Sequence, residues 1–413
     1  MTTTLLPPNL SQKLLADRDF RQMSEGSNVC FALAVRGGRT VGVHVKDGVV
    51  TDSRSAEFCV ELEHSDWSRV LAADVAPQQQ HVLAFLEPRG TGTVRGDKTS
   101  FAQHLHLVRR AVEVMAKRPT AAPGRTGGLS HIAGSYVAVD VPNWGPCDIY
   151  IETAGHGRPI LLLHTAGSDS RQFHGLLTDR ALTAHNRLIS FDLPWHGRSG
   201  PARGARPFDY TLSTQTYTDC ITGLIDALAL PQPPVAVGSS MAGAAVLEVA
   251  AYHPDKLAGV ISCQAGPRVS HRQTPWLRHA RVNQTLHVPE WTYGLMSPLS
   301  PVEHRDHLWW GYSQGGWGIY ERDIAYYTQW WDIDNIVSLF GPHTPPIVIM
   351  NGQYDYSVPP KASQELAALI PGARYRAMPE LGHFPHAENP AVFAHHLAWA
   401  LDEIERQGKG RRP

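Results

Sequence analysis

The sequence predicts an α/β protein, with a mostly parallel sheet and helices on both of its faces, preceded by a small α+β domain. Three observations lead to this prediction. Continuous apolar runs, as expected of strands buried on both faces, alternate with helical stretches in the later part of the chain. A stretch rich in Pro, Gly, Ala and Thr, residues 118–130, has no periodicity and is typical of a linker. Before it, short strand-like runs come first and an amphipathic helix comes last.

The part before the linker has strand and helix signals of its own. Strands are expected at 28–35, 40–50, 56–63 and 90–97, and helices at 65–74, 77–86 and 100–116. Lys46-Asp47-Gly48 is a hairpin turn signal within the second run. The linker predicts that this part can fold by itself.

The order of these elements resembles the sterol-carrier-protein-like fold over about residues 20–120. "ELEHSDWSRVLAAD", then "GTGTVRGD" and a closing amphipathic helix carry the resemblance. It implies an apolar tunnel that can hold a lipid or an acyl chain. The alternative, which we favour, is a small α+β module used for packing or dimerisation, through which two copies would form a homodimer. We expect no catalytic residue in this part.

Six apolar runs in the second part are predicted to be strands of one sheet: 158–164, 187–193, 234–238, 258–263, 346–352 and 373–379. Helical stretches lie between most of them. Because parallel strands end at the same edge of a sheet, the loops that follow these runs meet where α/β proteins bind their ligands. We therefore expect the residues that carry chemistry in those loops.

The strand at 234–238 passes directly into a helix through the sequence GSSMAG (238–243). This is the strand–turn–helix context of a G-x-S-x-G elbow, in which a strained turn exposes a serine hydroxyl above the sheet. Ser240 occupies the nucleophile position, and Ser239 occupies the variable position before it. Ala242 stands where the pattern has its second glycine, which follows one place later.

A serine hydroxyl is a poor nucleophile until a base takes its proton, and that base needs a carboxylate to fix its tautomer. Asp355 follows the predicted strand at 346–352, and His383 follows the one at 373–379. The chain order Ser, Asp, His is the order found in this architecture. The sequence therefore predicts that Ser240, Asp355 and His383 act together.

Three segments resemble those of the α/β-hydrolase superfamily: "LLLHTAGSDSRQF" (161–173), "FDLPWHGRS" (191–199) and "GHFPHAENP" (382–390). The resemblance covers about residues 135–405 and implies the α/β-hydrolase fold. It also implies Ser240 as the nucleophile, Asp355 as the orienting acid and His383 as the base.

The same resemblance implies an oxyanion hole made by two backbone N–H groups. Met241, the residue after the nucleophile, would supply one, and Ala166 the other, with Thr165 as the alternative second donor. Asp192 and His196 are expected to hold their own loop together by hydrogen bonds rather than to take part in the chemistry.

About 80 residues separate the predicted strands at 258–263 and 346–352, far more than the roughly 2 to 6 residues usual in an α/β loop. They contain seven of the eleven tryptophans. In hydrolases of this superfamily an insert at this point forms a helical cap. We therefore expect Trp310, Tyr312 and Trp317 to line an apolar substrate pocket, with most of the other rings in the core of the cap.

These observations give a predicted domain organisation. Residues 1–125 form the sterol-carrier-like α+β domain, 126–267 and 338–413 form the α/β-hydrolase core, and 268–337 form the aromatic-rich cap.

The composition excludes several classes of partner. The chain carries 37 basic and 38 acidic side chains and a net charge of −1, so we expect neither nucleic acid nor a membrane as a partner. We find no pattern of a signal peptide or an apolar span, and the five cysteines are widely spaced without a C-x-x-C pair. These features predict a cytoplasmic protein with free thiols. The 22 histidines form no set at metal-ligand spacing, and we expect neither a metal nor a cofactor.

Together the residues and the resemblance predict a serine hydrolase that cleaves a hydrophobic carboxylic ester through an acyl-enzyme. The ester would be uncharged or mono-anionic, and aromatic esters are included. Thioesters, lactones and carbamates remain open, because the same groups act on them. A carbon–carbon bond hydrolase of the ring-cleavage-product type is the alternative among enzymes, and a lipid-binding or scaffold protein with an inactive hydrolase half is the alternative from another class.

Overall fold

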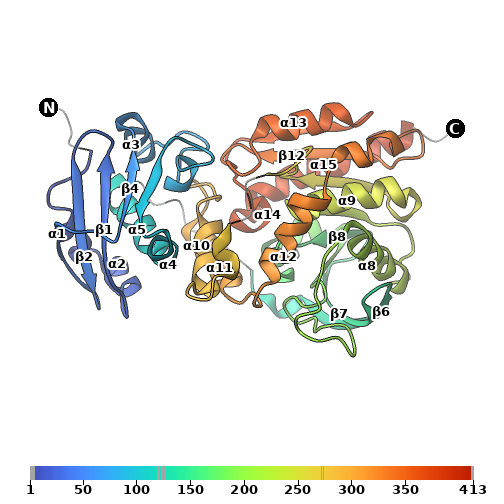
Figure 1. Cartoon of the computed structure of the whole chain (residues 1–413). Helices are drawn as coiled ribbons and strands as arrows, with labels where there is room; N and C mark the ends of the chain where they lie inside the picture. The colour runs from blue at the N-terminus through green and yellow to red at the C-terminus, as the bar shows by residue number, and fades with distance from the viewer. Residues whose placement is uncertain are drawn as a thin grey trace. The chain divides into compact units, whose positions relative to one another are not determined.

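The computed structural model describes residues 5–118, 121, 124, 127–270, 272 and 274–410. Within them the chain forms two compact units (Figure 1). Unit 1 comprises Met1–Ala121 and Pro275–Leu295, and unit 2 comprises Ala122–Thr274 and Met296–Pro413. Part of the predicted linker, at 119–120, 122–123 and 125–126, lies outside the described residues.

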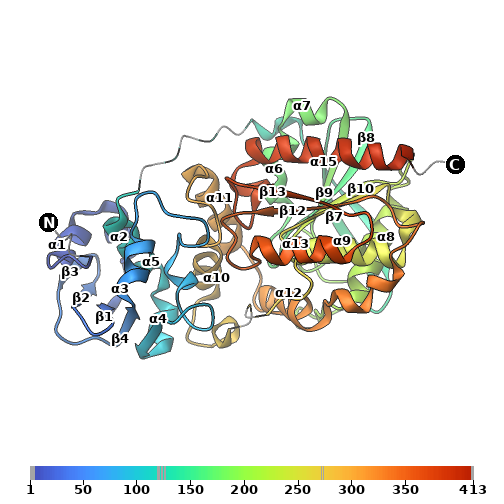
Figure 2. The same cartoon turned by 90° about the horizontal axis from the view of Figure 1, so that it is seen from above.

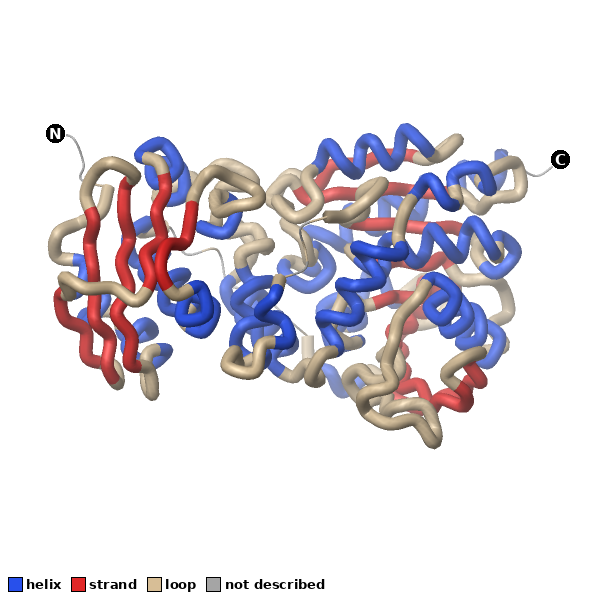
Figure 3. The backbone as a smooth tube through the Cα atoms, in the orientation of Figure 1, coloured by secondary structure: helices blue, strands red, loops and turns tan. Residues whose placement is uncertain are grey.

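Unit 1 is built on a five-stranded mixed sheet in the order β3-β2-β1-β4-β5 (Figure 3). The strands are β1 (Asn28–Val35), β2 (Thr40–Lys46), β3 (Val49–Asp52), β4 (Phe58–Leu62) and β5 (Thr93–Gly96). β1 and β4 are parallel, and the other neighbours are antiparallel. The predicted turn at Asp47 and Gly48 joins β2 to β3, with Lys46 opposite Val49.

The helices of unit 1 are α1 (Leu10–Ala16), α2 (Arg18–Met23), α3 (His64–Val70), α4 (Lys98–Gln103), α5 (Leu105–Ala116) and α10 (Gln284–Tyr293). α1 and α2 were not predicted, and two of the predicted helices differ from the structure. The expected helix at 100–116 is interrupted at His104, whose φ of −116° and ψ of 20° separate α4 from α5. The expected helix at 77–86 is wrong. Gln78 has a φ of 67°, and the His81 ring accepts a hydrogen bond from the Leu83 N–H (3.2 Å), so only one 3₁₀ turn forms.

α10 comes from the aromatic insert and packs on α5 within unit 1. The Arg109 guanidinium of α5 forms a buried bidentate pair with Glu290 of α10, with Nε–Oε2 and Nη2–Oε1 distances of 2.6 and 3.0 Å. It also lies 4.2 Å from the centroid of the Tyr293 ring. The predicted cap at 268–337 is therefore divided between the two units, because α10 buries its side chains against α5.

Unit 2 is built on an eight-stranded sheet in the order β13-β12-β11-β10-β8-β9-β7-β6. Its strands are β6 (Ala133–Val141), β7 (Gly145–Ala154), β8 (Arg158–Leu163), β9 (Asn186–Phe191), β10 (Val235–Ser239), β11 (Gly259–Cys263), β12 (Ile347–Gly352) and β13 (Arg374–Met378). β8 to β13 are the six predicted strands, and all pairings among these six are parallel, while β9 also pairs antiparallel with β7. The antiparallel β6–β7 hairpin was not predicted, because β6 is mostly exposed and lacks a continuous apolar run.

The helices of unit 2 are α6 (His174–Leu177), α7 (Arg180–Thr183), α8 (Thr214–Ala227), α9 (Met241–Tyr252), α11 (Val302–Ser313), α12 (Ile319–Ala325), α13 (Pro360–Leu369), α14 (Pro385–Glu388) and α15 (Pro390–Gly410). Helices cover both faces of the sheet, as the sequence predicted. Figure 2 shows α6 and α15 on one face, and α8, α9 and α13 on the other.

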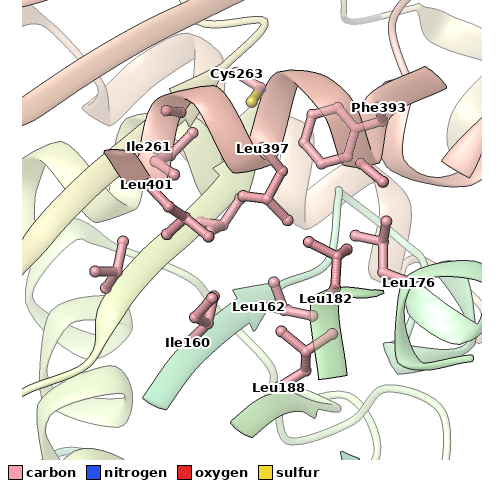
Figure 4. Packing of buried hydrophobic residues seen from close by; sticks show 14 of the residues in the cluster. Ile160, Leu162, Leu176, Leu182, Leu188, Ile261, Cys263, Phe393, Leu397 and Leu401 are labelled. Carbon is pink, nitrogen blue, oxygen red and sulfur yellow. The ribbon is translucent and has the colours of Figure 1, made fainter. Parts of the chain in front are cut away.

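A buried apolar cluster joins α15 to the sheet. Phe393, Leu397 and Leu401 are spaced four residues apart and so lie on one side of α15. In Figure 4 they face Ile160 and Leu188 of the central strands. This packing holds the strand ends of unit 2 in fixed positions. Among the helices of the described ranges, none is both long and apolar enough to cross a lipid bilayer.

Candidate active site

The turn between β10 and α9 holds Ser240 in a conformation that L-residues rarely adopt. Its φ is 60° and its ψ is −122°, and its side chain is buried. Two glycines make room for this turn. A Cβ at Gly238 would collide with the Ala242 carbonyl, and a Cβ at Gly243 would collide with the Cys263 carbonyl of β11. The close approach to β11 therefore occurs at Gly243, which is why Ala242 fits where the pattern has glycine.

The three predicted catalytic side chains lie in one buried row. His383 Nε2 is 2.9 Å from Ser240 Oγ, and His383 Nδ1 is 2.6 Å from Asp355 Oδ2. The second oxygen of Asp355 accepts the N–H groups of Ser357 (2.8 Å) and Val358 (3.0 Å). These bonds fix the carboxylate, which in turn orients the imidazole. Ser239 has a different partner, since its hydroxyl donates to the backbone carbonyl of His383 (3.2 Å).

The loop after β8 contains the two alternatives for the second oxyanion donor. The Thr165 N–H donates to Gln172 Oε1 (3.1 Å), so it is already engaged. Within the described residues, the N–H groups of Ala166 and Met241 have no acceptor. Met241 is the first residue of α9, and a helix leaves its first N–H groups without partners. Ala166, rather than Thr165, therefore has a backbone N–H that a ligand can use.

A buried carboxylate of α12, Asp323, was missed by the sequence reasoning. Its Oδ2 accepts the Gly167 N–H (2.7 Å) and is 2.9 Å from His196 Nε2, and its Oδ1 accepts the Tyr210 hydroxyl. Burial alone would lower the pKa of His196, but the Asp323 carboxylate outweighs it and holds that pKa above its usual range. Asp323 thus ties α12 to the loops after β8 and β9.

The loop after β9 is held as predicted through Asp192. Its two oxygens accept the N–H groups of Ser170 and Arg198, both at 2.7 Å. His196 also braces this loop, since its Nδ1 lies 3.0 Å from the Pro194 carbonyl oxygen. Its Nε2 bonds Asp323 in addition, and the position of Asp323 in the insert gave no local signal of that second bond.

Residues 160–396, more than half of the chain, match the family described as "Alpha/beta hydrolase family". The chain belongs to the α/β-hydrolase family. Among curated relatives of this hydrolase-family chain is a pimeloyl-[acyl-carrier protein] methyl ester esterase of Edwardsiella ictaluri (strain 93-146). The two are 30% identical over 120 residues, which are 29% of this chain and 41% of that protein.

A second relative is the dihydrolipoyllysine-residue acetyltransferase component of the acetoin cleaving system of Pseudomonas putida. It is 33% identical over 112 residues, which are 27% of this chain and 28% of that protein. The chain spans less than half the length of the curated relatives it matches. The solved enol-lactonase from Burkholderia xenovorans LB400 covers 64% of this chain with all of its own, at a TM-score of 0.55 and 19% identity. This last likeness concerns the fold, and the eight-stranded sheet is the hydrolase fold that the sequence predicted.

In this α/β-hydrolase chain a π-helical turn, Tyr326–Trp330, follows α12 and places two buried tyrosines. The Tyr327 hydroxyl donates to the Gln264 carbonyl (3.1 Å), directly after β11. The Tyr326 hydroxyl donates to Glu248 (2.7 Å), and burial raises the pKa of that carboxyl to about 7. The sequence indicated aromatic residues here, but not which backbone carbonyl or carboxylate their hydroxyls bond.

The three aromatic residues expected to line the pocket lie in different environments. Tyr312 is buried, and its hydroxyl is 2.7 Å from Thr165 Oγ1 in the loop after β8. Trp310 is 44% exposed beneath the Arg171 guanidinium, and Trp317 is 59% exposed against Phe208. Tyr312 is thus placed next to the candidate site, whereas the two tryptophans face solvent and their role in binding stays a prediction.

A cavity of about 220 Å³ lies beside the loop after β8 within unit 2. Its walls include Asp169 and Gln172 of that loop and His304, His307 and Leu308 of α11. None of the three predicted catalytic side chains lines it. Gln172, which lines the cavity, also accepts the Thr165 N–H through its Oε1.

Among the residues that the structure describes, no three His, Cys, Asp or Glu side chains gather closely enough to hold a metal ion. The five cysteines are free, and burial raises the pKa of the Cys147 thiol to about 11.

Proposed function

We propose that this chain is a serine hydrolase that cleaves hydrophobic carboxylic esters, aromatic ones included, through an acyl-enzyme. The observation that carries the proposal is the buried row of Ser240, His383 and Asp355 at the carboxyl edge of the sheet. The esterase among the relatives supports ester chemistry for the same family.

The first half of the reaction forms the acyl-enzyme. His383 Nε2 takes the Ser240 proton while Oγ bonds to the ester carbon, and the carbonyl oxygen becomes an oxyanion. The N–H groups of Met241 and Ala166 are the proposed donors to that oxyanion, because both lack another acceptor. When the oxyanion collapses, the bond to the alcohol oxygen breaks and His383 returns the proton to the alcohol.

The second half uses water in place of serine. His383 takes a proton from water, the hydroxide adds to the acyl carbon, and Ser240 leaves with the proton from the imidazolium. Asp355 keeps Nδ1–H of His383 pointed at its Oδ2, so that Nε2 is the basic nitrogen in both halves. The products are a carboxylic acid and an alcohol.

For unit 1 we propose the sterol-carrier-like fold. Its five-stranded mixed sheet, with α1 packed on β2 and β3 and α4 packed on β4 and β5, supports this proposal. Saturable binding of a fluorescent fatty acid to the full chain would favour a lipid tunnel, whereas concentration-dependent dimerisation without such binding would favour the packing module.

A fluorophosphonate probe tests the proposed hydrolase directly, because it phosphonylates an activated serine and needs no knowledge of the natural substrate. We expect one label per full chain, on Ser240, with loss of p-nitrophenyl ester hydrolysis. A folded chain that takes no label would be a binding or scaffold protein instead. Turnover of a ring-cleavage dienone without turnover of esters would assign the carbon–carbon hydrolase.

A further inference from the structure

Arg272, in the segment after β11, is one of two buried arginines in the described part of the chain, and the two have different partners. Arg109 forms a bidentate pair with a carboxylate, Glu290. Among the described residues, Arg272 hydrogen-bonds only with neutral hydroxyls. Its Nη1 donates to Ser357 Oγ (2.6 Å) and its Nη2 to Tyr320 Oη (3.2 Å).

The Nε–H of Arg272 has no acceptor, although the side chain is 2% exposed. Within the described ranges, no carboxylate lies within ion-pair distance of it. Asp355 is the anion whose charge acts on it, but both oxygens of Asp355 are occupied by His383, Ser357 and Val358. A buried cation without an anionic partner is costly, and proteins retain one where a ligand supplies the missing charge.

Arg272 remains a cation in this environment. Burial alone would lower the pKa of Arg272, but the neighbouring Tyr320 and Asp355 outweigh it and raise that pKa above its usual value. The unmatched positive charge is therefore a permanent property of the site.

The contacts of Arg272 place it beside the catalytic row. Ser357, which accepts its Nη1–H, also donates its N–H to Asp355. Tyr320 packs edge-to-face on Tyr312, with ring centroids 6.2 Å apart, and Tyr312 bonds Thr165 beside the proposed oxyanion donor. The charge of Arg272 also acts on the buried Tyr327 hydroxyl. The guanidinium is therefore linked to the row of Asp355, His383 and Ser240 through Ser357, and it lies among buried tyrosines.

We propose that Arg272 binds a carboxylate of the substrate, so that the ester cleaved at Ser240 is mono-anionic, such as a half-ester of a dicarboxylic acid. This inference rests on the proposed function. The planar guanidinium matches a carboxylate in shape, and the surrounding tyrosines accommodate the apolar part of such an ester. Water and the half-ester give an alcohol and a dicarboxylate, and the proton released goes to solvent.

Matched esters test the inference. Mono-p-nitrophenyl glutarate and p-nitrophenyl pentanoate differ only in a carboxylate that replaces a methyl group. We expect the full chain to prefer the glutarate, and Arg272→Gln to lower its kcat/KM by about 10- to 100-fold, as for a lost charge-assisted hydrogen bond. The pentanoate should change less than about threefold, and Arg272→Lys should restore part of the preference.

Arg268→Gln is the control, because Arg268 lies on the same segment but is exposed and paired with Asp332 and Asp334. Arg268→Gln should leave kcat/KM unchanged for both esters. An equal loss on both esters in Arg272→Gln would overturn the inference, since Arg272 would then only position the Asp355 loop through Ser357.

Binding to the Ser240→Ala chain separates this inference from the proposed function, because it needs no turnover. Calorimetry should show monomethyl glutarate binding at least about tenfold more tightly than methyl pentanoate, and this test does not require an Arg272 variant that folds. Equal affinities would overturn the inference even if the chain hydrolyses esters. Tighter binding of a phosphomonoester of similar length would overturn the assignment to a carboxylate. Selective binding in a chain that hydrolyses no ester would contradict only the proposed function.

Discussion

Ser240 is held in a strained conformation that the surrounding backbone enforces. Its N–H donates to the Cys263 carbonyl of β11 (2.9 Å), and the tight packing at Gly238 and Gly243 leaves no room for a relaxed turn. A backbone of this kind costs on the order of 1–3 kcal/mol and persists at sites where it positions a reactive group. Here the strain directs Oγ toward His383 rather than toward the interior of α9.

The two adjacent serines give the first prediction. Ser240→Ala should lower kcat for p-nitrophenyl esters by about 10⁴-fold or more, because the attacking oxygen is removed. Ser239→Ala should keep at least about a tenth of the activity, since its hydroxyl only donates to the His383 carbonyl. Steady-state kinetics on the two purified variants check both expectations, and equal losses would mean that the turn presents the other serine.

Site residues could be predicted from the sequence where they follow a recognisable local pattern. Ser240, Asp355 and His383 each follow a recognisable strand, and their order along the chain indicated their roles. Asp323 and Arg272 carry no such signal, because their partners are distant in sequence. Asp323 bonds Gly167, 156 residues away, and Arg272 bonds Ser357, 85 residues away. Asp323 and Arg272 are both buried, and no local sequence pattern predicts that a charged residue will be buried.

At the scale of elements, α12 is tied to two strand-end loops by the Asp323–His196 pair. The folded pKa of His196 is raised above its unfolded value of about 6.5. The contribution of the Asp323–His196 pair to stability is therefore fully present below that unfolded pKa. It is lost as the pH rises through the folded pKa of His196.

Asp323→Asn should remove this contribution. We expect the variant to melt about 5 °C or more below the unmodified chain at pH 5 to 6, because a buried charge pair is broken, and the difference to shrink toward pH 9. Melting curves across that range check it. Burial raises the pKa values of Glu248 and Glu388 to about 7 and about 8. Both carboxyls titrate in the variant and in the unmodified chain, so their effects cancel in the difference between the two melting temperatures. A difference that does not depend on pH would show that His196 is not charged in the folded protein.

The α5–α10 contact gives a third prediction. Arg109→Met should destabilise unit 1 by about 3–5 kcal/mol, because the buried Glu290 carboxylate would lose its bidentate guanidinium, whereas Arg109→Met with Glu290→Leu should recover much of the loss. Urea unfolding measures both. Arg110→Met on the same helix is the control, since its pair with Asp17 is partly exposed and should contribute about 1 kcal/mol or less. Equal effects at the two arginines would contradict this interpretation.

Helices and strands were predictable where their own residues carry the pattern. The six parallel strands of unit 2 are continuous apolar runs, and all six are present. The β6–β7 hairpin was missed because β6 is mostly exposed at the edge of the sheet. The division of the insert was missed because α10 is assigned to unit 1 by packing on α5, which lies about 170 residues earlier in the chain.

At the scale of the whole molecule, the proposed chemistry lies within unit 2, while part of the insert belongs to unit 1. A chain lacking residues 1–121 should therefore hydrolyse a small soluble ester with a kcat within about tenfold of the full chain. It should also bind a hydrophobic dye such as ANS, because α10 loses the helix that covers it. A folded but inactive shortened chain would show that unit 1 completes the active site.

The central claim is that Ser240 carries the acyl group during turnover. The most direct measurement is the mass of the full chain after rapid mixing with p-nitrophenyl trimethylacetate, whose hindered acyl group slows the attack of water on the acyl-enzyme. We expect one equivalent of p-nitrophenol in a burst, a mass increase of one acyl group, and the label on the peptide that contains Ser240, with none in Ser240→Ala. Ester turnover without a covalent adduct, or an adduct on another residue, would contradict the account.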